Sequence, residues 1–267
     1  MTDKLPAITA ENKNLTNELT QLHLEFLDLF TRHKEMVENE SVILTSLYLE
    51  KLGHLQLELL EKQTEESRLK MKMNLIQAAI NRDEKPDLKV IEQILNQRLQ
   101  KYYAQIEAQS AELDQARNVL THLISPEESA KLRETFRVLC KRLHPDLNPN
   151  QTEEEKDLFI KVKAAYDLQR LSDLQQILLY LDDSTIEKLE LVSGNEKMER
   201  IENLKATMLA LKDKIELLKS CFPFNVAELV YDEVQISLQQ EELRNQIKIV
   251  EEECAKYTNV LTLMTDD

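Results

Sequence analysis

The chain has 267 residues, of which 31% are charged and 5% are aromatic, and its formal net charge is −15. This acidic balance disfavours nucleic acid as a partner, because phosphate contacts need a basic surface, and it argues against docking on an anionic membrane. No stretch approaches the roughly 18 apolar residues of a membrane span, and the polar start MTDKLPAITAENKN has no apolar core of a secretory signal.

The residue types predict an all-α protein of the cytoplasm. Leu, Glu, Lys and Gln are abundant, which is typical of long helices and coiled coils, and there are only two glycines. The three cysteines, Cys140, Cys221 and Cys254, lie far apart and form no CxxC pair, so neither a zinc site nor a disulfide framework is indicated. The histidines are scattered without metal-ligand spacing, and we expect no metal and no cofactor.

Residues 1–120 are predicted to form an N-terminal coiled-coil hairpin. Apolar residues recur at heptad spacing between about Thr9 and Asn81, with a polar interruption at 38–40, which indicates one bent helix or two. Pro86 marks a turn, and a helix from about Asp87 to Leu120 follows. A short turn between two long amphipathic helices implies that they pack antiparallel.

Residues 121–182 form the most informative segment. Ser125-Pro126-Glu127-Glu128 predicts the start of a helix over 126–143, with a capping serine, proline in the first turn and early acids. Basic residues at spacings of four give that helix one basic face, which is an electrostatic handle for an acidic partner: Arg133, Arg137 and Lys141, with Arg142 beside them. A loop over 144–150 and helices through Tyr166 and over 172–180 follow.

The loop begins with His144-Pro145-Asp146, and the surrounding run RETFRVLCKRLHPDLNPNQTEEEKDLFIKVKAAYDLQRL resembles the central part of a J domain. The similarity extends from the HPD tripeptide and the basic helix to apolar positions of both helices and covers about 50 residues. The resemblance implies that a set of side chains holds the two helices together: Phe136, Leu139, Phe159, Val162, Ala165 and Tyr166.

The resemblance implies that the chain functions as a J-domain (DnaJ-like) co-chaperone. In that family the HPD loop and the basic helix bind an Hsp70-type chaperone and stimulate its ATPase. The implied contact residues are His144, Pro145 and Asp146, with Arg133, Arg137, Lys141 and Arg142. Pro145 fixes the backbone, so His144 and Asp146 are expected on a stiff turn where both can hydrogen-bond to a partner. A catalytic His/Asp pair would need a pocket and a third group, which the sequence does not name, so we expect no enzyme.

Two departures from the family pattern concern packing. The family's short first helix ends in Leu-Gly, whereas residues 118–124 read NVLTHLI. We expect the preceding coiled-coil helix to take its place, with Val119, Leu120 and Leu123 packing under Phe136 and Tyr166. Leu147 stands where the family usually has lysine.

Residues 183–267 are predicted to form a second antiparallel hairpin, with a turn at 221–225. Each long apolar stripe must be buried against something. Internal pairing is the default expectation, and a homodimer stays open. The two arms would hold a client or partner beside the J-like segment. The alternative is a structural or adaptor coiled-coil protein whose J-like module does not activate Hsp70.

Overall fold

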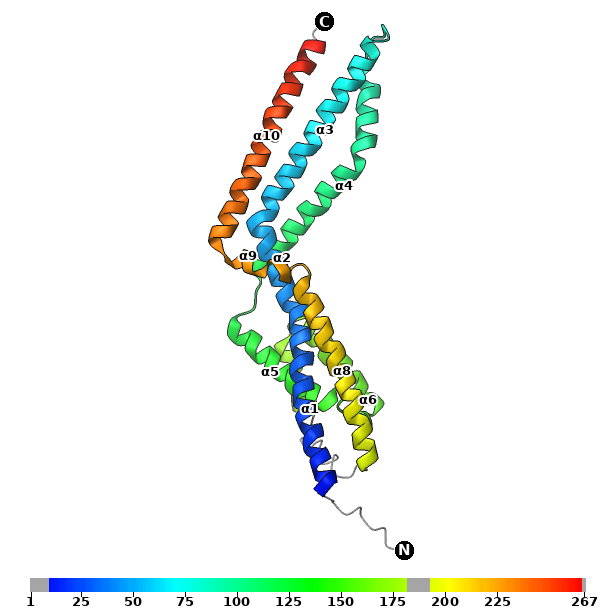
Figure 1. Ribbon diagram of the computed structural model, residues 1–267, viewed down its shortest axis with the longest axis vertical. Helices are drawn as coiled ribbons and strands as arrows, with labels where there is room; N and C mark the ends of the chain where they lie inside the picture. The colour runs from blue at the N-terminus through cyan, green and yellow to red at the C-terminus, as the bar shows by residue number, and fades with distance from the viewer. Residues whose placement is uncertain (1–9, 182–192, 266–267) are drawn as a thin grey trace. The chain divides into compact units, whose positions relative to one another are not determined.

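The computed structural model describes residues 10–181 and 193–265, and all of the regular elements in those two ranges are helices (Figure 1). The all-α prediction is therefore confirmed. Contacts divide the chain into two units, each made of two separate stretches of sequence: unit 1 is Met1–Ser41 with Leu123–Cys221, and unit 2 is Val42–His122 with Phe222–Asp267.

Unit 1 is built on two long helices that run parallel. It comprises α1 (Ala10–Glu35) with its π-helical continuation Met36–Glu40, α5 (Pro126–Leu143), α6 (Glu153–Asp167), α7 (Leu171–Tyr180) and α8 (Gly194–Ser220). Lys197 Nζ at the start of α8 donates 2.8 Å hydrogen bonds to Asn12 Oδ1 and Thr16 Oγ1. Further along both helices, Lys205 of α8 pairs with Glu18 of α1 at 2.7 Å. The matched order of these contacts fixes the parallel direction.

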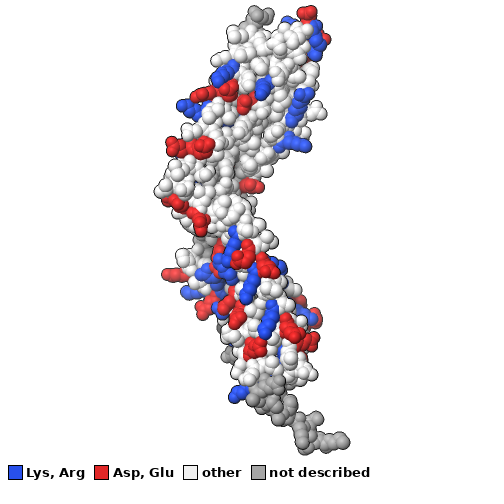
Figure 2. Space-filling model, in the orientation of Figure 1, with Lys and Arg blue, Asp and Glu red and all other residues white. Residues whose placement is uncertain are grey.

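The α1–α8 pair is held by the apolar spacing that the sequence displays. Ile201, Leu204, Met208 and Leu211 of α8 are buried in one cluster with Leu19, Leu22 and Phe26 of α1. Both stripes repeat every three and four residues, which keeps each stripe facing the other helix. Figure 2 shows basic and acidic side chains interspersed over the surface of these two helices, as expected where charges flank an apolar seam.

Helices α5 and α6 begin where their sequences predict. Ser125 Oγ accepts from the backbone N–H of Glu128 at 3.2 Å, and Thr152 Oγ1 accepts from that of Glu155 at the same distance. In each case the carboxylate of the glutamate also accepts a hydrogen bond from the backbone N–H of the capping residue. Two backbone donors that would otherwise be unpaired are therefore satisfied at each helix start. The Ser125 cap fixes the start of α5, and the Thr152 cap fixes the point where the loop between the two helices enters α6.

Unit 2 has α3 (His54–Ile80) at its centre, with α4 (Leu88–Thr121) and α10 (Glu233–Thr265) packed on it. It also contains α2 (Ser41–Tyr48), the π-helical segment Leu49–Gly53, the short 3-10 turn Phe224–Val226 and α9 (Ala227–Tyr231). Helices α3 and α4 run antiparallel, and Arg68 and Lys72 of α3 both pair with Glu92 of α4 near the turn between them.

Helix α10 runs parallel to α3. Lys51 at the start of this pairing contacts Glu233, Lys62 pairs with Glu251 at 2.9 Å, and Ile76 shares a cluster with Leu261. Lys62 interrupts the apolar spacing of the sequence, and its ion pair across to α10 explains how a lysine fits that position.

The expected C-terminal hairpin of residues 183–267 does not form among the described residues, because α8 packs on α1 and α10 packs on α3. The three consecutive segments 1–120, 121–182 and 183–267 therefore differ from the two discontinuous units of the structure. Heptad spacing specifies that a helix has an apolar stripe but not which helix covers it. The expected boundary between 182 and 183 lies outside the described residues.

In the ranges 10–181 and 193–265, none of the helices is both long and apolar enough to cross a membrane.

Candidate functional site

The HPD tripeptide lies in the loop that joins α5 to α6. The two helices are antiparallel, since Phe136 stacks on Tyr166 at one end and His144 contacts Phe159 at the other. The backbone N–H of His144 still donates to Cys140 O at 2.8 Å and completes α5. Pro145 and Asp146 follow and are exposed.

Hydrogen bonds make this loop compact. The backbone N–H groups of Leu147 and Asn148 donate to His144 O at 3.1 and 2.9 Å. The side-chain amide of Asn148 donates to Lys141 O at 3.1 Å, and Gln151 caps Leu143 O. Each of these bonds ties the loop to the end of α5, so the exposed Pro145 and Asp146 are presented on a fixed turn.

His144 itself points into the protein. It is 8% exposed, and three aromatic rings meet it edge-on with centroid distances of 4.5 Å from Phe30, 4.9 Å from Phe26 and 5.1 Å from Phe159. Its Nδ1 accepts from the backbone N–H of Asp146 at 3.2 Å. We assign the proton of the neutral ring to Nε2, because Nδ1 acts as an acceptor.

The electrostatics of this cage favour the neutral imidazole. Burial lowers the pKa of His144 to about 4; the Asp146 carboxylate opposes this shift and the Lys163 ammonium reinforces it. The expectation that His144 and Asp146 are both displayed to a partner therefore differs from the structure. Asp146 is displayed, whereas His144 holds the loop that displays it.

The basic face of α5 lies along α1. Arg133 pairs with Glu35, and Arg137 pairs with Asp28 at 2.5 Å. The guanidinium groups stay partly open to solvent, with side-chain exposures of 41% and 47%. Lys141 is exposed, and Arg142 donates to Leu181 O at 3.0 Å. The structure brings these four basic residues to one helix, as their spacing implies, but acidic residues of α1 already contact two of them.

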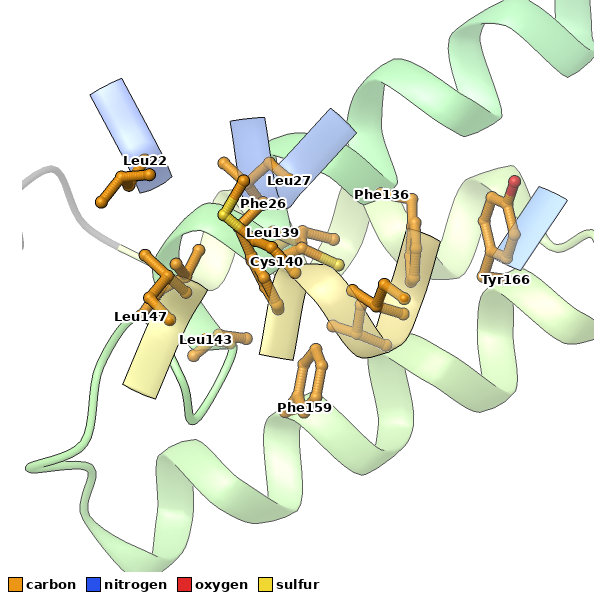
Figure 3. Close-up of a cluster of buried hydrophobic side chains, with 14 of the residues drawn as sticks. Leu22, Phe26, Leu27, Phe136, Leu139, Cys140, Leu143, Leu147, Phe159 and Tyr166 are labelled. Carbon is orange, nitrogen blue, oxygen red and sulfur yellow. The ribbon is translucent and has the colours of Figure 1, made fainter. Parts of the chain in front are cut away.

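The side chains assigned to the helix–helix packing are buried in a single cluster: Phe136, Leu139, Phe159, Val162, Ala165 and Tyr166. Figure 3 shows α1 contributing to the same cluster, with Phe26 and Leu27 beside Leu139 and Cys140. Phe136 stacks on Tyr166 with centroids 4.0 Å apart. Burial raises the pKa values of the Cys140 thiol and the Tyr166 phenol, so both stay protonated at neutral pH.

The cover over this cluster comes from α1, which corrects one expectation. The ring centroids of Phe30 and Phe136 lie 6.4 Å apart, and the side-chain amide of Asn39 donates to the Tyr166 hydroxyl at 3.4 Å. Residue Leu123, expected beneath Phe136 and Tyr166, is 46% exposed, and Val119 and Leu120 belong to α4 in unit 2. An upstream helix can take that place because contact in space does not require closeness in sequence.

Leu147 also finds a structural explanation. It is 6% exposed and belongs to the same buried cluster, where Figure 3 shows it beside Leu143. A lysine at this position would have to place its ammonium group in an apolar environment or leave the cluster. Leucine in place of the family's usual lysine thus suits a loop in which the side chain at position 147 packs into the protein.

Sequence reasoning missed the α1 side of the site. Phe26 lies in the stretch whose apolar residues recur at heptad spacing, and Phe30, four residues later, faces α5. Asp28 and Glu35 are seven residues apart, so they share a face of α1 and match the basic face of α5. That matching of acidic and basic spacing was a signal available in the sequence.

The chain was compared with protein-family models, with curated proteins and with solved structures, and no match was found in any of the three. Within the described ranges, no group of three or more His, Cys, Asp or Glu side chains is arranged to hold a metal ion.

Proposed function

We propose that this protein is a J-domain co-chaperone that binds an Hsp70-type chaperone and stimulates its ATPase. The observation that carries the proposal is the exposed Pro145-Asp146 pair, fixed on a turn at the end of a basic helix. A carboxylate on a rigid turn can make a strong, directional bond to a basic partner group without a large loss of entropy on binding.

The basic residues extend this contact. Lys141 is exposed, and Arg133 and Arg137 are each about half exposed. Because α1 already supplies carboxylates to both arginines, binding of an acidic chaperone surface would replace their ion pairs with Glu35 and Asp28 by ion pairs with the chaperone. In this proposal the protein is not an enzyme, and the α1–α8 and α3–α10 pairs hold a client or partner.

A second candidate function is a structural or adaptor protein whose J-like module does not activate Hsp70. The observation in its favour is the engagement of α5 by α1, since Phe26 and Phe30 enclose His144 while Asp28 and Glu35 contact the arginines. In this case the same contacts serve to fold the unit.

Single-turnover ATP hydrolysis by the cognate Hsp70 distinguishes the two candidates. We expect stimulation by the intact chain and its loss on Asp146→Asn. Asp146 is exposed, so this substitution should leave helicity and thermal stability unchanged. Asp173→Asn, at a partly exposed acid on α7, is the matched control and should stimulate fully. Absence of stimulation by the intact chain, or full stimulation by Asp146→Asn, would favour the adaptor.

A further inference from the structure

Helix α10 carries two apolar stripes on opposite sides. The first faces α3 and includes the buried residues Ile236, Ile247, Cys254 and Leu261. The second is formed by apolar residues that are all exposed, by 41% to 74%, and we call it the outer α10 stripe: Val234, Leu238, Ile249, Val260 and Leu263. With 100° between successive residues of a helix, the second stripe lies about 180° from the first.

The outer α10 stripe has the spacing of a helix-pairing surface. Leu238, Ile249 and Val260 are eleven residues apart, which is close to three full turns, so they lie in line along the helix. Single exposed apolar residues are ordinary on protein surfaces, whereas five in register along one helix mark an interaction surface.

The polar residues within the stripe identify the partner. Counting from Ile249, Glu242 lies seven residues before it and Lys256 seven residues after it. Leu238 and Val260 lie eleven residues before and after it. If a second α10 packed antiparallel with the two Ile249 residues in contact, Leu238 would meet Val260 of the second copy, and Glu242 would meet Lys256, in both halves.

The remaining positions follow this symmetry to within one residue. Val234 and Leu263 lie fifteen and fourteen residues from the centre, and Asn245 and Glu252 lie four and three residues from it. A side-chain amide can donate to a carboxylate. Such self-complementarity is the requirement for a two-fold interface, in which the same surface serves both copies.

We propose that the outer α10 stripe is the interface of an antiparallel homodimer centred on Ile249. Glu242 and Lys256 are free to form the ion pairs between chains that this dimer requires, because their contacts within the single chain are weak. In the single chain, Glu242 accepts from Gln246 at 2.8 Å and Lys256 pairs with Glu253 at 2.6 Å, and both contacts lie within one exposed helical surface. Contacts of this kind exchange readily for a pair between chains. The inference concerns unit 2 alone and does not depend on binding to Hsp70.

Sedimentation equilibrium of the full chain over a series of concentrations is the first test. We expect a monomer–dimer equilibrium that Ile249→Glu weakens by about tenfold or more, because two carboxylates would then face each other at the centre. Leu209→Glu, at a residue of α8 that is 62% exposed, is the matched control and should leave the equilibrium unchanged. A chain that stays monomeric, or a dimer that Ile249→Glu does not weaken, would overturn the proposal.

Charge exchange tests the register. Glu242→Lys and Lys256→Glu should each weaken the dimer at low salt, since each creates two like-charged contacts, and the combined variant should restore it. Failure of the combined variant to recover affinity would rule out this register.

Cysteine cross-linking tests the direction. With Cys221 replaced by serine, Leu238→Cys mixed with Val260→Cys should form a disulfide between chains, whereas Leu238→Cys alone should not. Residues 238 and 260 are about 33 Å apart along one helix, so an antiparallel pair separates the two copies of residue 238. Efficient cross-linking of Leu238→Cys with itself would contradict the antiparallel arrangement.

Discussion

At the scale of single residues, the largest difference between expectation and structure concerns His144, which was expected on the surface and is buried. Three aromatic rings surround it and its Nδ1 accepts from the backbone of Asp146. Replacing it with glutamine therefore removes packing as well as a recognition group. A loss of chaperone stimulation in His144→Gln would combine both effects, which is why Asp146→Asn is the sharper test of the contact.

The buried imidazole predicts a pH dependence of stability. The pKa of His144 in the folded chain is about 4, below the usual value of 6.5, so the unfolded chain takes up this proton first as the pH falls. The stabilisation is complete above pH 6.5 and is lost progressively toward pH 4. Between pH 7 and pH 5 we expect this group to lower the free energy of unfolding by about 2 kcal/mol.

Urea unfolding followed by circular dichroism at both pH values measures this change. The His144→Gln chain lacks the titrating ring and should lose less stability over the same interval. His23, whose pKa burial also lowers to about 4, is present in both proteins and cancels in the comparison. Identical pH dependence in the two proteins would show that His144 is not buried in its neutral form.

Leu147 supports a second prediction at this scale. Leu147→Lys introduces the residue usual in J domains, yet we expect it to lower the free energy of unfolding by about 2 kcal/mol or more, because the position is 6% exposed and lined by apolar groups. Leu168→Lys, at a residue that is 62% exposed, is the control and should change stability by less than about 0.5 kcal/mol. Equal stability of Leu147→Lys and the original chain would contradict the inward packing of the loop.

At the scale of elements, the contact between α1 and α5 decides how open the basic face is. Asp28 and Glu35 pair with arginines that are nearly half exposed, so each pair contributes little to stability. We expect the combined change Asp28→Asn and Glu35→Gln to alter stability by less than about 1 kcal/mol. It should strengthen binding to the ATP-bound chaperone about two- to fivefold at low salt, since an acidic partner no longer competes with α1.

Glu18→Gln is the matched control for this binding measurement. It removes an exposed ion pair of the same helix, with Lys205, but at the contact with α8 instead of α5. Its affinity for the chaperone should equal that of the original chain. An unchanged or weaker affinity of the Asp28/Glu35 variant would show that α1 does not compete for the basic face.

The helices themselves were largely predictable from the sequence. The breaks at Pro86, at Ser125 and after Leu143 agree with the observed ends of α4 and α5, because proline and capping residues act locally. Asp232 was missed as a break: its carboxylate caps α10 by accepting from Val234 and Gln235, in a segment predicted as continuous helix.

At the scale of the whole molecule, partner choice was the part that the sequence did not specify. The three-and-four spacing of α8 suits α10 as well as α1. In the structure α8 packs on α1, where Lys197 bonds to Asn12 and Thr16, and the apolar spacing does not reveal these contacts. The role of α1 over His144 was missed for the same reason, since Phe30 meets its partner more than a hundred residues later in the chain.

This arrangement predicts that residues 121–182 do not form a well-packed domain alone. The fragment lacks Phe26 and Phe30, which cover His144 and Phe136. We expect it to retain helical circular dichroism but to bind the dye ANS strongly, as loosely packed states do. Co-expressed fragments 1–41 and 123–221 should associate and bind little dye. Weak dye binding and cooperative unfolding of fragment 121–182 would contradict the prediction.

The parallel pairing of α1 with α8 also bears on how the protein is made. Helix α1 is synthesised well before α8, the helix that it pairs with, because α8 begins only at Gly194. At common elongation rates, roughly ten to forty seconds separate the two. The hairpin of α3 and α4 can close meanwhile from adjacent sequence, and Phe30 of α1 can meet α5, whereas the leucines of α1 that face α8 stay uncovered until α8 is made. During translation this protein should itself be a substrate for the chaperones that shield nascent chains, for about as long as its central segment takes to be synthesised.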